Sequence, residues 1–319
     1  MKYLPDNHAW KDANVTAGDP AIQSRYQVCR KEKMRKMLLA IYKYAVKILS
    51  GHRIGKFYHV RTAHNFIISH LKTTFAEVDG HKMFLDSKDS LNLSVKGIYE
   101  PLQTELVKKE IKKGDVVLNI GANIGYYTLI FAKLVGDDGK IFAFEPAPTN
   151  FSLLKKNVEI NSYKNVVLVQ KAVSNKTGKL KLYLSEDNMG DHRIYNSYDN
   201  RESIEIEAVR LDDYFKNYRA GINFIKMDIQ GAEYGAIQGM LNLLKENNLK
   251  IIMEFWPSGL KRFGIAPAEC LELLVEFGFR LFEVNEREKK IRPVNVPRLL
   301  EIYTPEKENY TKLLCIREK

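Results

Sequence analysis

Two glycines stand directly after an apolar run in VVLNIGANIGYYTLIFAKL, residues 116–134. Gly121 and Gly125 allow the backbone to turn tightly and allow a ligand to approach it closely. The helix that we expect after them offers unpaired N–H groups and a partial positive charge to an anionic group. This stretch therefore predicts a ligand-binding turn between a strand and a helix.

The spacing of the glycines argues against two phosphate sites. The dinucleotide fingerprint G-x-G-x-x-G would need further glycines where Asn123 and Tyr126 stand, and no Gly-Lys-Ser/Thr follows as a P-loop would require. Glu145 ends the next expected strand, 24 residues after Gly121. An acidic residue at about this distance accepts hydrogen bonds from ribose hydroxyls. A nucleoside without a diphosphate, such as S-adenosylmethionine, fits both features.

The polar loop SEDNMGDHRIYN, residues 185–196, holds the side chains best suited to proton transfer. His192 can accept a proton at physiological pH, because an ordinary histidine has a pKa of about 6.5. Asp191 could orient the imidazole, and Arg193 could hold an anionic group of a substrate. Asp228 is the alternative base. A solvated surface loop is the competing interpretation of the same residues.

Two further acids are open to more than one interpretation. Glu233 fits a helix first turn, where the helix dipole favours a negative charge. Glu254 either lines the crevice beyond the carboxyl ends of the strands or is a buried, paired carboxylate. Asp228 and Glu254 could bind a divalent cation. The sequence has no compact ligand cluster, so we predict no required metal.

Alternating strands and helices must position these residues. After Asp115 we expect strands at 116–120, 140–145, 166–170, 222–228, 250–255 and 279–284, and helices at 124–135, 148–161, 231–246 and 267–277. This alternation is typical of a doubly wound parallel sheet. GKLKLYLS and SIEIEAVR, between 178 and 210, predict an antiparallel pair. FRLFEVNE and YTKLLCIRE predict a terminal β-hairpin whose last strand runs antiparallel.

The N-terminal part has a different character. Residues 1–20 read as a tail, and 21–49 predict an amphipathic helix, because Met34, Met37, Leu38 and Ile41 recur at spacings of three and four. Residues 73–97 predict a β-hairpin that turns at Asp79-Gly80. A further helix is expected at 99–112.

The net charge of +11 is concentrated in this part. Residues 1–75 hold 14 lysines and arginines against 4 acidic residues, a net charge of +10. Residues 30–49 could lie on an anionic membrane surface or, as we favour, pack their apolar stripe on the body or on a second subunit. No run of about 18 uncharged apolar residues predicts a membrane span. Three scattered cysteines fit a reducing compartment, so we expect a cytoplasmic protein, peripheral to the membrane if the arm binds it.

The motifs GANIGYYT, FEPAPTN, AVSNKTG and DIQGAE occur in that order within roughly residues 95–285. With the surrounding sequence they resemble the FkbM-type family of S-adenosylmethionine-dependent methyltransferases. The resemblance implies a Rossmann-like class I methyltransferase fold, S-adenosylmethionine as cofactor, and O-methylation, often of sugars or natural products. Asn119 stands where methyltransferases commonly carry an acid, and Gln230 stands where this family often has Glu. Both keep a hydrogen-bonding oxygen and lose a charge.

The resemblance also implies site residues. The turn of Gly121 to Gly125 would surround the methionine part of the cofactor, Glu145 would hold the ribose, and Lys171 would border the adenine. Glu100 would reach the methionine amine, and Asp228 would face both cofactor and acceptor. The cofactor-binding set is therefore Glu100, Gly121, Ala122, Asn123, Gly125, Glu145, Pro146, Lys171, Ala172 and Asp228, and the catalytic set is Asp191, His192 and Asp228.

We therefore expect an O-methyltransferase that acts on a hydroxyl of a glycan, a lipid-linked saccharide or a small natural product. Residues 96–319 would form the catalytic domain, with an insertion at about 178–210, and residues 1–95 an extension of helix and hairpin. A nucleic-acid methyltransferase is the first alternative, with the basic arm binding phosphates. MDIQGAE, in place of the Asn/Asp-Pro-Pro-aromatic motif of base methylases, argues against it. A catalytically inactive cofactor-binding protein is the second. Homo-oligomerisation stays open.

Overall fold

A computed structural model describes residues 30, 33–35, 37–42, 44, 66–67 and 71–317 of the chain. Its contacts divide the chain into two units, Met1–Leu71 and Lys72–Lys319. In the first unit, the described residues between 30 and 44 are helical, as predicted, and Met34, Met37, Leu38 and Ile41 are exposed on it. The predicted tail at 1–20 and the rest of the 21–49 helix lie outside the described residues. Within the described residues, no helix has the length and apolar character needed to cross a bilayer.

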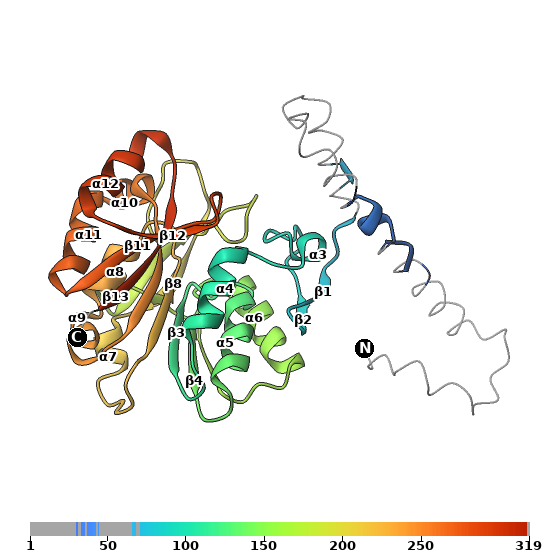
Figure 1. The fold of residues 1–319 in the computed structure, drawn as a ribbon, viewed down its shortest axis with the longest axis horizontal. Coiled ribbons are helices and arrows are strands. Elements are labelled where there is room, and N and C mark those ends of the chain that lie inside the picture. The colour runs from blue at the N-terminus through green and yellow to red at the C-terminus, as the bar shows by residue number, and fades with distance from the viewer. Residues whose placement is uncertain are drawn as a thin grey trace. The chain divides into compact units, whose positions relative to one another are not determined.

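An eight-stranded sheet forms the centre of the second unit (Figure 1). Its strand order is β12-β11-β13-β10-β9-β3-β4-β5. The neighbours β10, β9, β3, β4 and β5 run parallel, and β13 runs antiparallel to both β10 and β11. The bounds are β3 Val116–Ile120, β4 Lys140–Phe144, β5 Val166–Val169, β9 Phe224–Met227, β10 Lys250–Phe255, β11 Phe279–Asn285, β12 Lys290–Val294 and β13 Thr311–Arg317.

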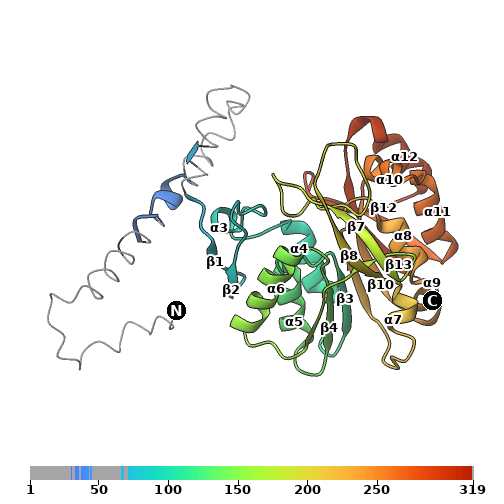
Figure 2. The same cartoon turned by 180° about the vertical axis from the view of Figure 1, so that it is seen from behind.

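Helices cover both faces of this sheet, which explains why its central strands are nearly continuous apolar runs. One apolar cluster joins one face to α4, α5 and α6, and a second joins the other face to α8–α12 (Figures 1 and 2). The predicted doubly wound α/β fold is therefore confirmed. The bounds are α4 Pro101–Glu110, α5 Tyr126–Val135, α6 Pro148–Ile160, α7 Leu211–Tyr214, α8 Glu233–Gln238, α9 Leu241–Glu246, α10 Pro257–Phe263, α11 Pro267–Glu276 and α12 Val296–Ile302.

The predicted antiparallel pair between 178 and 210 is present. It consists of β7 (Gly178–Tyr183) and β8 (Ser203–Val209), and β6 (Ala172–Val173) adds a third strand beside β8. Its two long strands run beside each other in Figure 2. The loop between β7 and β8 carries the predicted histidine.

The predicted N-terminal hairpin is present but shorter than the predicted 73–97, as β1 (Phe75–Val78) and β2 (His81–Phe84) around Asp79-Gly80, and the second half of that range contains the short helix α3 (Leu93–Lys96). Both turn residues have positive φ, as a tight two-residue hairpin turn requires. Asn157 of α6 bonds to both backbone groups of Phe84, at 2.6 Å and 2.9 Å. These contacts place the hairpin in the same unit as the sheet. The boundary between units falls at 71/72, whereas the sequence suggested 95/96.

Two predicted details of the fold are wrong, the terminal hairpin and the single helix at 231–246. The terminal hairpin is formed by β11 and β12, while β13 inserts between β11 and β10. The strand β12 was missed because KIRPV is mostly exposed and contains a proline. The single helix at 231–246 is instead the two helices α8 and α9. They break at Gly239, where a Cβ would lie 2.1 Å from the carbonyl oxygen of Ser174.

Candidate active site

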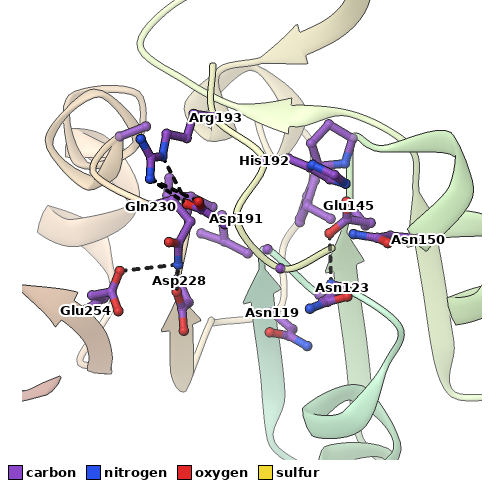
Figure 3. A pocket seen from close by; sticks show the side chains of 18 of the residues that line it. Asn119, Asn123, Glu145, Asn150, Asp191, His192, Arg193, Asp228, Gln230 and Glu254 are labelled. Carbon is purple, nitrogen blue, oxygen red and sulfur yellow. Dashed lines mark hydrogen bonds and ion pairs between the residues drawn. The ribbon is translucent and has the colours of Figure 1, made fainter. Parts of the chain in front are cut away.

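A cavity of ≈ 360 Å³ opens at the carboxyl ends of the parallel strands (Figure 3). The turns after β3, β4, β9 and β10, the loop between β7 and β8, and part of β13 line it. From β3 the chain adds β4 and β5 on one side and later β9 and β10 on the other. Ligands of open α/β sheets bind where the strand order reverses in this way. The cavity volume lies in the range of small-molecule sites, about 300–1,000 Å³.

The glycine turn packs closely against the end of β9. Gly121 has φ +77°, and a Cβ there would lie 2.1 Å from the carbonyl oxygen of Asp228. The N–H groups of Gly121 and Ala122 donate to the carbonyl oxygen of Phe144 at 3.0 Å and 2.9 Å. Gly125, with φ +99°, precedes the first residue of α5. The predicted tight turn is thus present, the close approach seen here is that of the chain itself, and the close approach of a ligand stays a prediction.

Glu145 lies at the end of β4, with only 5% of its surface exposed. Its carboxylate accepts hydrogen bonds from the backbone N–H of Asn123 at 2.8 Å and from that of Ala147 at 3.0 Å. Burial outweighs these bonds and raises the pKa of Glu145 to about 7. Asn150 lies beside it with its amide oxygen buried and unpaired among the described residues (Figure 3). This half of the cavity therefore offers a carboxylate and an amide oxygen to a polar ligand.

The other half contains a buried ion cluster around Lys312 of β13. The ammonium of Lys312 lies 2.8 Å from Asp228, 2.9 Å from Glu254 and 3.3 Å from Glu100. The sequence did not single out Lys312, although it stands directly opposite Glu254 in the β10–β13 register. Lys226 of β9 contributes a second ammonium, 3.4 Å from Asp228.

Two carboxylates of this cluster have pKa values shifted in opposite directions. Burial opposes ionisation of Asp228, but Lys226 and Lys312 hold its pKa well below the ordinary value. Burial raises the pKa of Glu254 to about 7, against the attraction of Lys312. Burial also disfavours the charge of Lys312, but Asp228, Glu100 and Glu254 together raise its pKa. Glu254 is therefore the member of the cluster that exchanges a proton near neutral pH.

Gln230 connects two acids of this cluster. Its amide nitrogen lies 2.9 Å from Asp228 and 3.3 Å from Glu254, as Figure 3 shows. A glutamate here would add a fourth carboxylate, so the uncharged residue is the better match. Gln230 has φ +58°, and the cavity residues Glu100 and Asn123 also have positive φ. Such strained residues concentrate at functional sites.

The loop between β7 and β8 covers the cavity and is anchored to the body. Asp191 accepts hydrogen bonds from Arg193 at 3.0 Å and from Arg201 at 2.7 Å. The guanidinium of Arg193 lies 4.9 Å from the ring centre of Trp256. The hydroxyl of Tyr195 donates to the carbonyl oxygen of Gln230 at 2.7 Å. Arg193 is thus already paired, which leaves little of it for the anionic substrate group predicted from the sequence.

His192 lines the cavity, but its contacts differ from those predicted. Its Nδ1 accepts a hydrogen bond from the backbone N–H of Ser185 at 3.0 Å, so in the neutral ring Nε2 carries the proton. Burial and then Arg201 lower its pKa. Asp191 bonds to the two arginines and makes no hydrogen bond to His192 in the described structure. In this conformation His192 is a hydrogen-bond donor to the cavity, and its role as a base stays a prediction.

The remaining predicted residues, Pro146, Lys171 and Ala172, also line the cavity. Lys171 pairs with Glu207 at 2.8 Å. Residues 71–317 and the described residues before them contain no group of three or more His, Cys, Asp or Glu side chains that could hold a metal ion. Cys270 and Cys315 are buried and unpaired.

Glu233 is fully buried in the first turn of α8, where the sequence placed it. One carboxyl oxygen accepts the N–H of Ile229 at 3.0 Å, and the other is unpaired among the described residues. Burial, and then the neighbouring Glu254, raise its pKa to about 8. Since this pKa exceeds that of Glu233 in the unfolded chain, the folded state binds more protons. The stability of the fold therefore falls as the pH rises from about 4.5 to about 8.

We therefore expect Glu233→Gln to weaken the pH dependence of stability. Between pH 5.5 and 8.5, urea denaturation should show the wild type losing on the order of 2 kcal/mol more than the variant. The slopes of the free energy of unfolding against pH are compared, because the buried glutamine amide lowers this free energy at every pH. The exposed Glu276→Gln serves as the control and should follow the wild type. Parallel curves for wild type and Glu233→Gln would contradict a raised pKa at this position.

Comparisons with known proteins identify the family of the chain. Residues 119–281, just over half of the chain, match the family described as Methyltransferase FkbM domain. The chain is 25% identical over 173 residues to the hexuronic acid methyltransferase AglP of Haloferax volcanii, covering 54% of this chain and 66% of that protein. It is 28% identical over 163 residues to the 31-O-demethyl-FK506 methyltransferase FkbM of Streptomyces tacrolimicus, covering 41% and 61%. A solved FkbM methyltransferase from Methylobacillus flagellatus has a TM-score of 0.38 at 13% identity, covering 70% and 52%.

Proposed function

This chain belongs to the FkbM family of methyltransferases, and from that premise we propose that it methylates a hydroxyl oxygen of a saccharide, a lipid-linked saccharide or a small natural product. The enzyme is an S-adenosylmethionine-dependent methyltransferase. The observation that carries the proposal is that one cavity joins the glycine turn and Glu145 to an ion cluster suited to a hydroxyl group.

The first half of the cavity fits the cofactor. Gly121, Ala122 and Asn123 of the glycine turn line this half, and the close packing of Gly121 on the end of β9 fixes the position of the turn. The buried, unpaired oxygen of Asn150 lacks a donor that a bound nucleoside could supply. When bound, the cofactor supplies a methyl group on a good leaving group. We propose that residues 121–125 hold its methionine part, that Glu145 binds the ribose hydroxyls, and that Pro146, Lys171 and Ala172 border the adenine.

The second half fits an acceptor hydroxyl. A hydroxyl oxygen is a poor nucleophile at neutral pH, and a general base assists it by roughly 10²–10⁴-fold. Lys226 and Lys312 hold the pKa of Asp228 well below the ordinary value, so its basicity is low. Glu254 takes up a proton near neutral pH and lines the same half. We propose that the acceptor's proton passes to this pair of carboxylates, with Glu254 as the stronger base. Aligning the two reactants can contribute about 7–11 kcal/mol more.

The charge of the cluster and the names of the relatives support this acceptor class. Around Lys312, the three acids Glu100, Asp228 and Glu254 outnumber the single ammonium, so this part of the cluster carries a net negative charge. Such a site favours a neutral hydroxyl over an anion. The two relatives are named for a hexuronic acid and for a 31-O-demethyl compound, and the second name places the methyl group on an oxygen.

The exposed stripe of Met34, Met37, Leu38 and Ile41 supports an additional partner for the N-terminal helix. Its apolar residues repeat on one helical face, and the surrounding sequence is strongly basic. We propose that this helix contacts either an anionic membrane surface or a second subunit. A membrane contact would bring the enzyme near a lipid-linked acceptor.

The test of the cofactor half is calorimetric binding of S-adenosylmethionine and S-adenosylhomocysteine. We expect micromolar affinity for the wild type and a loss of about 1–3 kcal/mol in Glu145→Ala, because a buried hydrogen-bond partner is removed. Glu159→Ala, an exposed acid on α6, is the matched control and should bind like the wild type. Hydroxylated acceptors would then be screened by release of S-adenosylhomocysteine. A wild type that binds neither compound would refute the assignment.

A further inference from the structure

Lys226 is a buried lysine whose ammonium group is poorly satisfied. It lies in β9 with 5% of its surface exposed, and it lines the cavity. Within the described part of the chain its ammonium makes one hydrogen bond, to Asp228 at 3.4 Å, and lies 5.2 Å from the ring centre of Tyr127. An ammonium has three donors, and a buried charge is costly unless it is paired and hydrogen-bonded. This geometry leaves room for an anionic group of a ligand.

The neighbouring strand β3 adds no negative charge beside Lys226. Asn119 of β3 stands directly opposite Lys226 in the parallel register, so both side chains lie on the same face of the sheet. The amide nitrogen of Asn119 donates to Thr128 at 2.9 Å, and its amide oxygen is buried without a partner in the described structure. Figure 3 shows Asn119 below the glycine turn at the end of its strand. An acid at this position would pair with Lys226, whereas asparagine leaves the lysine with Asp228, at 3.4 Å, as its one acidic partner in the described structure.

A negative charge lies on the other side of the same tyrosine. The hydroxyl of Tyr127 donates to Glu100 at 3.1 Å, while the ring of Tyr127 faces Lys226. Lys312 cannot replace Lys226 as an anion site, because three carboxylates already surround it. One end of the cavity therefore presents a cation, an anion and an unpaired amide oxygen close to the glycine turn. A group that carries both signs of charge, such as an α-amino acid, is complementary to this arrangement.

We propose that Lys226 binds the α-carboxylate of the cofactor's methionine part, and that Glu100 and the amide oxygen of Asn119 accept hydrogen bonds from its α-ammonium. This inference rests on the proposed function and extends it, because it assigns each charge of the amino acid to a named side chain. It also gives Asn119 a reason to be uncharged.

The test compares S-adenosylmethionine with decarboxylated S-adenosylmethionine, which lacks only the carboxylate. Calorimetry on the wild type should show a preference of roughly 10- to 100-fold for the carboxylated compound, as expected for a hydrogen bond between charged groups. Lys226→Met should reduce the preference to less than about threefold by weakening only the carboxylated compound. Lys140→Met, at the exposed start of β4, makes the same substitution away from the cavity and should keep the preference. If Lys226→Met does not fold, Lys226→Gln takes its place.

Each outcome separates the two proposals. Equal binding of both compounds by the wild type would overturn the role of Lys226 and leave the methyltransferase assignment standing. A preference that survives in Lys226→Met would do the same. A wild type that binds neither compound would refute the cofactor site itself, and this inference with it.

Discussion

Replacing Lys312 with methionine should lower the free energy of unfolding by about 3–5 kcal/mol, the cost of breaking a buried ion pair from one side. Lys312 is 5% exposed and lies within 3.3 Å of three carboxylates. Without its charge, Asp228, Glu254 and Glu100 would repel one another in a cavity that excludes most water. Urea denaturation at pH 7 measures the loss.

The loss should be larger at pH 8 than at pH 5. Burial already raises the pKa of Glu254 to about 7, and removing Lys312 takes away an interaction that lowers it. A carboxyl whose folded pKa exceeds its unfolded value destabilises the protein once the pH rises above the unfolded value. At pH 5 the acid stays protonated in the folded variant, and part of the repulsion disappears.

Lys250→Met is the matched control for this prediction. Lys250 lies in β10 and pairs with Glu110 at 2.5 Å, but 38% of its side chain is exposed. We expect a loss below about 1 kcal/mol, as is usual for exposed pairs. Adding Glu254→Gln to Lys312→Met should restore part of the stability. Equal losses in the two lysine variants, or no recovery in the double variant, would show that the cluster does not depend on Lys312.

Local patterns predicted which residues line the half of the cavity around the glycine turn and Glu145. The strand β3, the turn at Gly121 and the acid at the end of β4 lie within 30 residues of one another, and each has a direct physical signature. Apolar runs indicate buried parallel strands, and glycines indicate positive φ. The parallel sheet then brings the strand ends together without further information.

The half of the cavity around Lys312 depended on contacts between distant segments. Lys312 lies 84 residues from Asp228 and 58 from Glu254 along the chain. It stands in TKLLCIR, which reads as an ordinary buried strand, and only its insertion beside β10 gives it acidic neighbours. The nearest signal in the sequence was a lysine within an otherwise mostly apolar strand. The same argument applies to Lys226, whose importance depends on its neighbour Asn119 across the sheet.

Sequence neighbours misled the interpretation of the β7–β8 loop. Asp191 and His192 are adjacent, which suggested an orienting pair, but adjacent side chains in an extended segment point to opposite sides. Asp191 instead meets Arg193 and Arg201, two and ten residues further on. Residue types in a loop indicate which chemistry is available, whereas its partners depend on how the loop folds over the body.

Gly121→Ala should abolish cofactor binding. Its loss of stability should also exceed the cost of placing a non-glycine residue in the left-handed backbone conformation. A non-glycine residue in the left-handed region costs roughly 1–2 kcal/mol. At Gly121, with φ +77°, the new Cβ would also lie 2.1 Å from the carbonyl oxygen of Asp228 and 3.1 Å from the side chain of Ile229. Because the first of these contacts is backbone, the turn itself has to move. That movement would shift the N–H of Asn123 away from Glu145 and so disturb both ends of the cofactor half.

Gly114→Ala separates the collision from the backbone cost. Gly114 has φ +85°, and a Cβ there would meet nothing within 4 Å. We expect Gly114→Ala to lose only the roughly 1–2 kcal/mol of the left-handed conformation and to bind S-adenosylhomocysteine like the wild type. Urea denaturation and calorimetry compare the two variants. Normal binding by Gly121→Ala, with a stability equal to that of Gly114→Ala, would mean that the turn does not need its close contact with β9. If only Gly121→Ala loses binding, the cofactor site depends on the close contact between the glycine turn and the end of β9.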